Sequence, residues 1–182
     1  MDELFDEFAL VAVEAFDFAA QHAWRVDFVE LLASETVPNT AMAVITDFGS
    51  FENLHPTQKE PVGARLALAA RAIAYGEKIE YSGPIYEALK IEGGRAVLRF
   101  KHVGGGLVAK DGPLKGFTIA GADGNFVPAQ AEIVDDTVVV SGEGVAAPVA
   151  VRYGWANVPD VNLYNKEGLP ASPFRTDLPS EK

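Results

Sequence analysis

Cysteine is absent from this sequence of 182 residues, and basic side chains are scarce. Without cysteine there is no disulfide framework, no thiolate metal site and no cysteine nucleophile. Lysine and arginine number 15 against 26 aspartates and glutamates, so the formal net charge is -11. Nucleic acid and an anionic membrane are therefore not expected as partners, because the overall field would repel both. The hydrophobic content of 48% is ordinary for one substantial globular domain or two small ones.

The segment 1–23 lacks the pattern of a leader peptide or a membrane span. A secretory signal needs a basic start and an uninterrupted apolar run, and a spanning helix tolerates few charges. The segment is apolar but carries acidic residues throughout, at Asp2, Glu3, Asp6, Glu7, Glu14 and Asp17. As written, the sequence is expected to be cytoplasmic, or to be a mature or partial form that lacks its export signal.

The first half of the chain predicts an α/β arrangement. From about residue 3 to residue 32 the apolar residues follow the three–four spacing of an amphipathic helix. The run 41–46 is almost continuously apolar, which is typical of a strand buried on both faces. A polar loop at 47–59 follows. A helix is then expected to begin near Pro61 and to end near Gly76.

After residue 84 the pattern changes to short alternating or β-branched runs separated by Gly, Asp and Asn. Gly93-Gly94 and Asp135-Asp136 are typical of hairpin turns. Strands are expected at 87–91, 96–100, 116–120, 129–133, 137–140 and 148–153. This half therefore predicts an antiparallel β-domain, most simply a small sandwich. The tail at 162–182 has no periodicity and is expected to lie as extended chain against the rest.

Several motifs between about Pro38 and Asp177 together resemble the C-terminal part of a sialate O-acetylesterase. They are PNTAMAV at 38–44, LHP at 54–56, VGARLAL at 62–68, YSGP at 81–84, VRYGW at 151–155, NLYN at 162–165 and GLPASPFRTD at 168–177. The first 37 residues carry no such motif.

The resemblance implies an SGNH-type carbohydrate esterase that removes O-acetyl groups from sialic acids and related sugars, in a family that is often secreted. It implies a flavodoxin-like α/β layer with a serine nucleophile, a histidine base and an acid shortly before the histidine, and no metal or organic cofactor. The expected fold is a partial layer of this kind followed by a small antiparallel β-sandwich. The expected domains are a helical segment at 1–37, the remnant of the layer at 38–84 and the β-rich domain at 85–182.

The segment Glu52-Asn53-Leu54-His55-Pro56 carries most of the functional information. In such esterases the histidine takes the serine proton and later returns it to the leaving alcohol, while a carboxylate orients the imidazole. The resemblance places His55 at the position of the base. Glu52 is then the residue that could orient it as an anion. Asn53 could hydrogen-bond the substrate but cannot stabilise positive charge.

The nucleophile is missing from its place in the family pattern. The family serine lies far upstream in a Gly-Asp-Ser-like or Gly-Glu-Ser-like motif, and this chain contains neither. Among its six serines, Ser50 follows Gly49 and lies shortly before His55, so it is the candidate substitute. A capping or turn role for Ser50 is the alternative. The chain resembles the rear portion of a longer or divided esterase.

Other residues that could bind a metal, a phosphate or a sugar could equally have a structural role. His22 and His102 have no acidic or histidine partners at ligand spacing, so no metal site is expected. The glycines at 104–106 do not open a helix, which favours a loop or bulge over a phosphate cradle. Trp155 could stack on a sugar ring, or could belong to the core or to a domain interface.

Three functions remain open at this point. The first is a carboxylic-ester hydrolase acting on an O-acylated sugar or a small ester through His55, Glu52 and either Ser50 or a serine of a partner polypeptide. The second is a non-catalytic fragment or carbohydrate-binding module. The third is assembly: the single strand at 41–46 would leave unpaired backbone edges, which predicts self-association or a missing N-terminal half.

Overall fold

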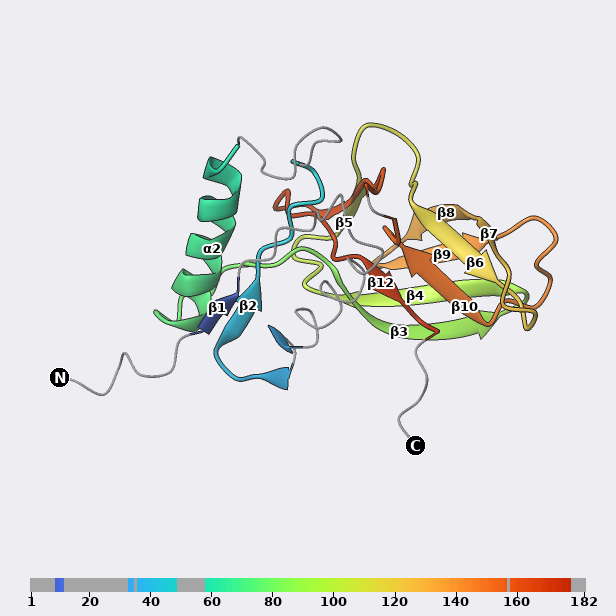
Figure 1. Ribbon diagram of the computed structural model, residues 1–182, viewed down its shortest axis with the longest axis horizontal. Helices are drawn as coiled ribbons and strands as arrows, with labels where there is room; N and C mark the ends of the chain where they lie inside the picture. The colour runs from blue at the N-terminus through green and yellow to red at the C-terminus, as the bar shows by residue number, and fades with distance from the viewer. Residues whose placement is uncertain (1–8, 12–32, 35, 49–57, 157, 178–182) are drawn as a thin grey trace. The chain divides into compact units, whose positions relative to one another are not determined.

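The computed structural model describes residues 9–11, 33–34, 36–48, 58–156 and 158–177. Antiparallel sheet makes up most of the described structure, together with the helix α2 (Figure 1). The chain divides into two compact units, residues 1–82 and 83–182. The three expected domains, with boundaries after residues 37 and 84, remain a prediction.

The first unit contains a short parallel ladder. Strand β1 (Ala9–Val11) pairs with β2 (Thr40–Met42), with Ala9 opposite Thr40. The prediction of helix over 3–32 is therefore wrong at 9–11, where pairing with a distant strand overrides the local helical spacing. Residues 3–8 and 12–32 lie outside the described residues. Because β2 finds a partner within the chain, the expectation of a single unpaired strand is also wrong.

The apolar run at 41–46 is buried as expected but is only partly a strand. The ladder ends at Met42, and residues 43–46 continue without strand pairing. Ala43, Val44 and Ile45 are nevertheless all buried. A continuous apolar run signals burial, but it does not distinguish a paired strand from irregular buried chain.

Helix α2 (Glu60–Ile73) begins where the sequence predicts it. Pro61 lies in the first turn, where its missing N–H leaves no helical hydrogen bond unmade. Beyond the helix end, Gly76 has a φ of 67° and the N–H of Glu77 donates to the carbonyl of Arg71 at 3.0 Å. The predicted end near Gly76 is therefore confirmed, because glycine reaches positive φ at little steric cost.

The second unit contains a four-stranded antiparallel sheet in the order β3-β4-β9-β8 (Figure 1). Its strands are β3 (Ile85–Glu92), β4 (Arg95–Lys101), β8 (Gln130–Val134) and β9 (Thr137–Ser141). Both predicted hairpin turns are confirmed, because Glu92 pairs with Arg95 and Val134 pairs with Thr137. Gly93 and Gly94 have φ values of 54° and 80°, as a two-residue turn between twisted strands requires.

A second four-stranded sheet has the order β12-β10-β6-β7, and a separate ladder pairs β11 with β5. These strands are β5 (Leu107–Ala109), β6 (Phe117–Ala120), β7 (Phe126–Pro128), β10 (Ala150–Tyr153), β11 (Leu163–Asn165) and β12 (Phe174–Arg175). The sequence predicts β6 and β10 but misses the other four. Each of these four strands has only two or three residues, which is too short to show alternation. Two of them, β11 and β12, lie in the tail that was expected to be extended chain without pairing.

One hydrophobic cluster joins the inward-facing residues of both four-stranded sheets. Along β4 the buried residues alternate with exposed ones, and Leu98 is fully buried. From the other sheet, Ile119 and Val151 are fully buried members of the same cluster. Tyr153 is buried too, and its hydroxyl oxygen accepts a hydrogen bond from the N–H of Leu163 at 2.9 Å. The second unit therefore has a continuous core in which the fully buried phenol of Tyr153 is hydrogen-bonded.

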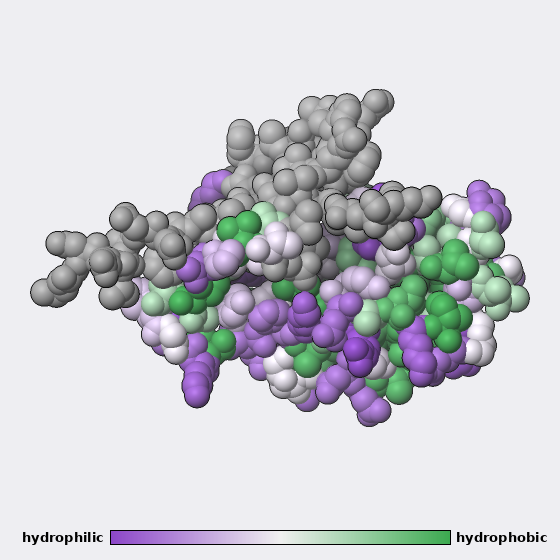
Figure 2. Space-filling model, turned by 90° about the horizontal axis from the view of Figure 1, so that it is seen from below, coloured by the Kyte–Doolittle hydropathy of each residue, from purple (hydrophilic) through white to green (hydrophobic). Residues whose placement is uncertain are grey.

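The outward-facing residues of the first of these sheets are largely charged and pair with one another. Arg95 lies 3.9 Å from Glu132, and Arg99 lies 3.7 Å from Glu87. Figure 2 shows hydrophilic and hydrophobic residues interspersed on the face of the molecule that it draws. This pattern is typical of a sheet with one solvated face. Within the part of the chain that the structure describes, no helix is long and apolar enough to cross a membrane.

Candidate functional site

The predicted catalytic residues fall together in one segment. Ser50, Glu52, Asn53 and His55 all lie within 49–57, outside the described residues. Their expected roles therefore remain predictions. The chain is described on both sides of this segment, and side-chain contacts join the two flanks.

A buried ion pair connects the two flanks. Arg65 of α2 donates from both terminal nitrogens to the carboxylate of Asp47, each at 2.7 Å. Its Nη1 also donates to the backbone carbonyl of Val44 at 2.5 Å. The guanidinium carbon lies 5.1 Å from the ring centre of Phe48. The chain that enters segment 49–57 is thereby held to the helix that follows it.

This pair is suited to positioning rather than to proton transfer. The side chains of Arg65 and Asp47 are 10% and 11% exposed. An arginine does not release its proton in proteins, and both oxygens of Asp47 are engaged. A bidentate guanidinium–carboxylate contact fixes orientation as well as distance. The chemistry that it supports must come from other residues.

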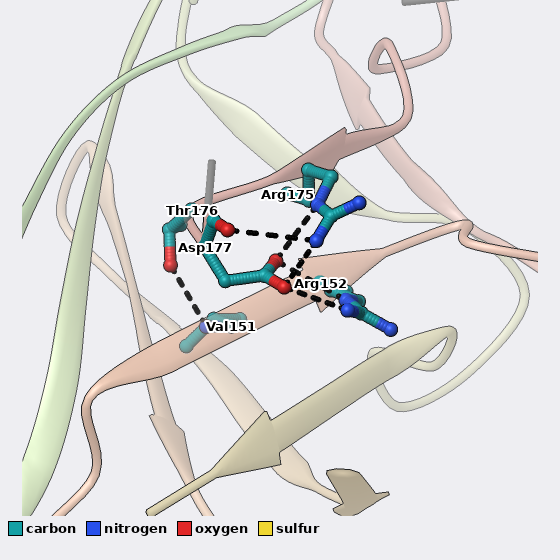
Figure 3. A network of polar contacts seen from close by, with 5 residues as sticks. All are labelled: Val151, Arg152, Arg175, Thr176 and Asp177. Atoms are coloured by element: carbon teal, nitrogen blue, oxygen red, sulfur yellow. Dashed lines mark hydrogen bonds and ion pairs between the residues drawn. The ribbon is translucent and has the colours of Figure 1, made fainter. Parts of the chain in front are cut away.

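A second polar cluster lies in the C-terminal unit, where two arginines share the carboxylate of Asp177 (Figure 3). Arg152 of β10 donates to it from Nε at 3.2 Å and from Nη2 at 2.6 Å. Arg175 of β12 donates from Nε at 2.9 Å, and its Nη2 bonds the other oxygen. Thr176 accepts a hydrogen bond from the N–H of Val151 and donates its own N–H to the carbonyl of Val151, each at 3.0 Å. The chain around Asp177 is thus fastened to β10.

The electrostatics of this cluster are unbalanced. Partial burial alone would raise the pKa of the Asp177 carboxyl, but the hydrogen bonds and charges of Arg152 and Arg175 outweigh it and hold the pKa well below its usual value. Asp177 is therefore ionised at neutral pH. Within the described part of the chain, one carboxylate therefore faces two guanidinium groups, which is an excess of one positive charge.

Aromatic rings cover one face of each guanidinium in this cluster. The carbon of the Arg152 guanidinium lies 3.7 Å from the ring centre of Phe126. The corresponding carbon of Arg175 lies 5.3 Å from the ring centre of Trp155. Both contacts are within cation–π range. Trp155, the aromatic residue that the sequence singles out for sugar binding, therefore lies beside a charged cluster, and its sugar-binding role stays a prediction.

The sequence does not single out the five charged residues of these two arrangements. For Arg65 a signal is present: it lies four residues before Ala69 on the buried face of α2, where an arginine requires a partner. Arg152, Arg175 and Asp177 give no local signal, because they meet through two short strands that are distant in sequence. They do lie within two of the motifs that carry the resemblance, VRYGW and GLPASPFRTD.

The residues weighed for metal or phosphate binding have structural contacts. Among the described residues, no group of three or more His, Asp or Glu side chains could hold a metal ion. His102 follows β4 with a φ of 56°, and its carbonyl accepts a hydrogen bond from Asn165 at 3.1 Å. The glycines at 104–106 lie in the turn between β4 and β5, where the N–H of Gly105 donates to the carboxylate of Glu167 at 3.0 Å. His22 lies outside the described residues.

Comparisons with known proteins give consistent results. No model of a protein family matches the sequence. The chain is 32% identical over 155 residues to the sialate O-acetylesterase of Homo sapiens, covering 76% of this chain and 29% of that protein. It is 37% identical over 71 residues to the sialate O-acetylesterase of Mus musculus, covering 36% of this chain and 13% of that protein. The chain thus spans less than a third of the length of the curated relatives it matches.

A solved structure is also similar. The crystal structure of a carbohydrate acetylesterase from Xanthomonas citri superposes with a TM-score of 0.78 and is 50% identical in sequence. The match covers 85% of this chain and 35% of that one. Since 85% of the chain exceeds either unit alone, the similarity includes residues of both units.

Proposed function

This chain belongs to the sialate O-acetylesterase family, and from that membership we propose that it forms part of a carboxylic-ester hydrolase acting on O-acetylated sugars. The observation that carries the proposal is the similarity in sequence and structure to the carbohydrate acetylesterase of Xanthomonas citri. The substrate class is an O-acylated sugar or a small ester, and the proposed reaction uses no metal or organic cofactor.

We assign the proton-transfer role to His55, with Glu52 orienting the imidazole and Asn53 hydrogen-bonding the substrate. The histidine would accept the proton of a serine hydroxyl and return it to the sugar oxygen as the ester breaks. The buried Arg65–Asp47 pair supports this assignment, because it joins the chain before segment 49–57 to the helix after it. Holding a base in place is worth several orders of magnitude in rate when it keeps the reacting atoms aligned.

In this proposal the first unit corresponds to part of an SGNH-type, flavodoxin-like layer, and the second unit to a small β-sandwich. The parallel pairing of β1 with β2 beside a helix is the kind of element that such a layer contains. The nucleophile is Ser50 or a serine of another polypeptide. Among the described residues this ladder has two strands, and its outer edges could pair with a second copy or with a partner carrying the remaining strands, so self-association belongs to the same proposal.

Hydrolysis of p-nitrophenyl acetate by the purified chain tests the proposal. His55→Ala is expected to lower the rate by roughly a hundredfold or more, the typical worth of a positioned general base. His102→Asn is the matched control, because it removes another imidazole while keeping a residue that tolerates positive φ. A rate unchanged in His55→Ala would reject the assigned base.

Labelling with a fluorophosphonate probe locates the nucleophile. A modified peptide that contains Ser50, and that disappears in Ser50→Ala, would assign the attacking hydroxyl to this chain. Labelling that requires a second polypeptide would assign it to a partner.

The alternative function is a non-catalytic carbohydrate-binding module. The missing Gly-Asp-Ser-like motif favours it, as does the aromatic ring of Trp155 beside Arg175. In that case the chain binds sugars without hydrolysing esters, and no serine reacts with the probe.

A further inference from the structure

We propose that Asp111-Gly112 is a site of spontaneous isoaspartate formation, in which the backbone comes to run through the aspartate side chain. This modification uses no residue of the proposed ester chemistry. The sequence contains two Asp-Gly dipeptides, Asp111-Gly112 and Asp123-Gly124, and both belong to the second unit. The fold leaves the reacting groups of the first dipeptide available and engages those of the second.

The reaction needs only the dipeptide and water. The backbone nitrogen of Gly112 attacks Cγ of the protonated Asp111 carboxyl group. The nitrogen loses its proton and the carboxyl hydroxyl leaves as water, which closes a cyclic succinimide. Water then adds to the ring carbonyl that derives from the backbone, and the bond from that carbon to the nitrogen breaks. The chain now continues through Cγ, the former backbone carbonyl is a free carboxylate, and the product has the same atoms as the starting chain.

The reacting groups of Asp111-Gly112 are accessible. Both residues are exposed, in the connection between β5 and β6. Among the described residues, neither the Asp111 carboxylate nor the Gly112 N–H makes a hydrogen bond of ordinary length and angle. A Cβ built on Gly112 would meet nothing within 4 Å. Because glycine has no side chain to shield its nitrogen or restrict its rotation, this dipeptide can approach the geometry of ring closure.

At Asp123-Gly124 the same groups are engaged. The Asp123 carboxylate accepts hydrogen bonds from the side-chain amide of Asn125 at 2.7 Å and from its backbone N–H at 3.2 Å. These bonds, the first above all, hold the pKa of the Asp123 carboxyl below its usual value, which disfavours the protonated form that reacts. The N–H of Gly124 donates to the carbonyl of Gly121 at 3.0 Å. Since both dipeptides are exposed, hydrogen bonding and not burial distinguishes them.

Contacts of Asn162 hold the chain on either side of Asp111-Gly112. The buried amide nitrogen of Asn162 donates to the carbonyl of Lys110 at 2.8 Å and to that of Pro113 at 2.9 Å. Its side-chain oxygen accepts the N–H of Lys115 at 3.0 Å. The exposed dipeptide therefore spans a gap between two anchored carbonyls. Because isoaspartate adds one carbon to the backbone path, the modification is expected to break at least one of these contacts.

Incubation of the intact chain in heavy-oxygen water at neutral pH tests the site. Each passage through the succinimide adds a heavy oxygen to the resulting carboxylate, which mass spectrometry of the digested chain detects. The peptide with Asp111 is expected to gain label roughly tenfold faster than the peptide with Asp123, the factor that about one hydrogen bond is worth. Methylation by an isoaspartate-specific carboxyl methyltransferase, with S-adenosylmethionine as the methyl donor, identifies the rearranged product.

Two variants and one condition separate the effect of the fold from that of the sequence. Asn125→Ala removes the side-chain donor to Asp123, so labelling at Asp123 is expected to rise severalfold while labelling at Asp111 stays unchanged. Asp111→Glu keeps the charge but requires a larger ring, so labelling at this position is expected to be lost. In urea, where both dipeptides are freed from the fold, their rates are expected to become similar.

Labelling at Asp123 as fast as at Asp111 in the folded chain would overturn the proposal, as would the absence of label at Asp111. A difference that persists unchanged in urea would also overturn it, because the local sequence and not the fold would then be the cause. In the aged chain, faster exchange of the Lys115 amide proton is the expected sign that the contacts of Asn162 are broken.

Discussion

The two units of this chain both place arginine against aspartate, but they balance the charges differently. In the first unit one guanidinium meets one carboxylate, and the carbonyl of Val44 takes a further hydrogen bond from Arg65. In the second unit Arg152 and Arg175 both pair with Asp177, the one carboxylate that they contact among the described residues. The first arrangement is electrically complete and nearly buried, while the second carries excess charge and is more exposed.

The difference in burial and charge balance predicts different contributions to stability. The buried pair of Arg65 and Asp47 fixes the geometry of the chain around it. The more exposed cluster of Arg152, Arg175 and Asp177 is expected to contribute less to the free energy of unfolding, because solvent screens its charges. Breaking each arrangement should therefore have different consequences, which the following predictions separate in order of size.

Arg65→Met is expected to cause the largest loss of stability, because it breaks the buried ion pair with Asp47 in the first unit. It leaves Asp47 buried without its cation, and removing one partner of a buried pair costs about 3–5 kcal/mol in the free energy of unfolding. Urea denaturation of the purified chain measures this loss. Arg71→Ala is the control on the same helix, where an exposed pair with Glu77 is broken and no measurable change is expected. An equal loss of stability in the two variants would contradict the prediction that the buried pair contributes more than the exposed one.

Tyr153→Phe tests whether the core of the second unit depends on a neutral polar contact. The substitution removes the hydroxyl that accepts the N–H of Leu163, so a buried donor loses its partner. A loss of about 1–3 kcal/mol is expected by denaturation. Tyr86→Phe, which changes a half-buried phenol that packs against Phe174, serves for comparison and is expected to cost less.

Asp177→Asn tests the cluster of the second unit through the pH dependence of its stability. The pKa of Asp177 is lower in the folded state than in the unfolded state, so the folded state binds fewer protons and the stabilisation is complete above the unfolded pKa of about 3.9. It is lost as the pH falls below that value toward the folded pKa. The wild type should exceed the variant by about 1–2 kcal/mol at neutral pH, a modest figure because the cluster is partly exposed.

Thermal denaturation of both proteins from pH 7 down to pH 2 tests this prediction. The difference in stability should be constant at pH 5 and above and should shrink on further acidification. A difference that grows toward low pH would contradict the assigned direction of the pKa shift.

The smallest effects are expected where each unit buries a hydroxyl without a hydrogen-bond partner among the described residues. These are Thr46 in the first unit and Ser172 in the second. Thr46→Val and Ser172→Ala remove a polar atom whose burial is uncompensated, so each should be neutral or should stabilise the fold by up to about 1 kcal/mol. Differential scanning calorimetry detects the change, and a clear loss of stability would indicate that the hydroxyl has a partner after all.

Much of the second unit could be predicted from the sequence, because its long strands alternate and its turns carry their own signals. Gly93-Gly94 and Asp135-Asp136 each lie between strands that pair as expected. The strands that were missed, such as β12, owe their pairing to distant partners and not to their own pattern. In the first unit the same reason accounts for β1, where a helical spacing gives way to a ladder with residues 40–42.

The residues of the candidate site also differ in whether a local sequence pattern identifies them. His55, Glu52, Asn53 and Ser50 are recognised by local order in the chain, and their roles stay predictions because segment 49–57 lies outside the described residues. Arg65 could have been suspected from its place on the buried face of α2. The meeting of Arg152, Arg175 and Asp177 could not, because no local pattern records which short strands will pair.

Order and spacing along the chain are enough to predict the family, the helix that starts at Glu60 and the alternating strands. The three-dimensional fold is needed to show that one arginine meets one carboxylate in the first unit, whereas two arginines share one carboxylate in the second. The physical reason is that charge balance depends on which groups come within a few ångströms in space, and strand pairing brings together residues that are far apart in sequence.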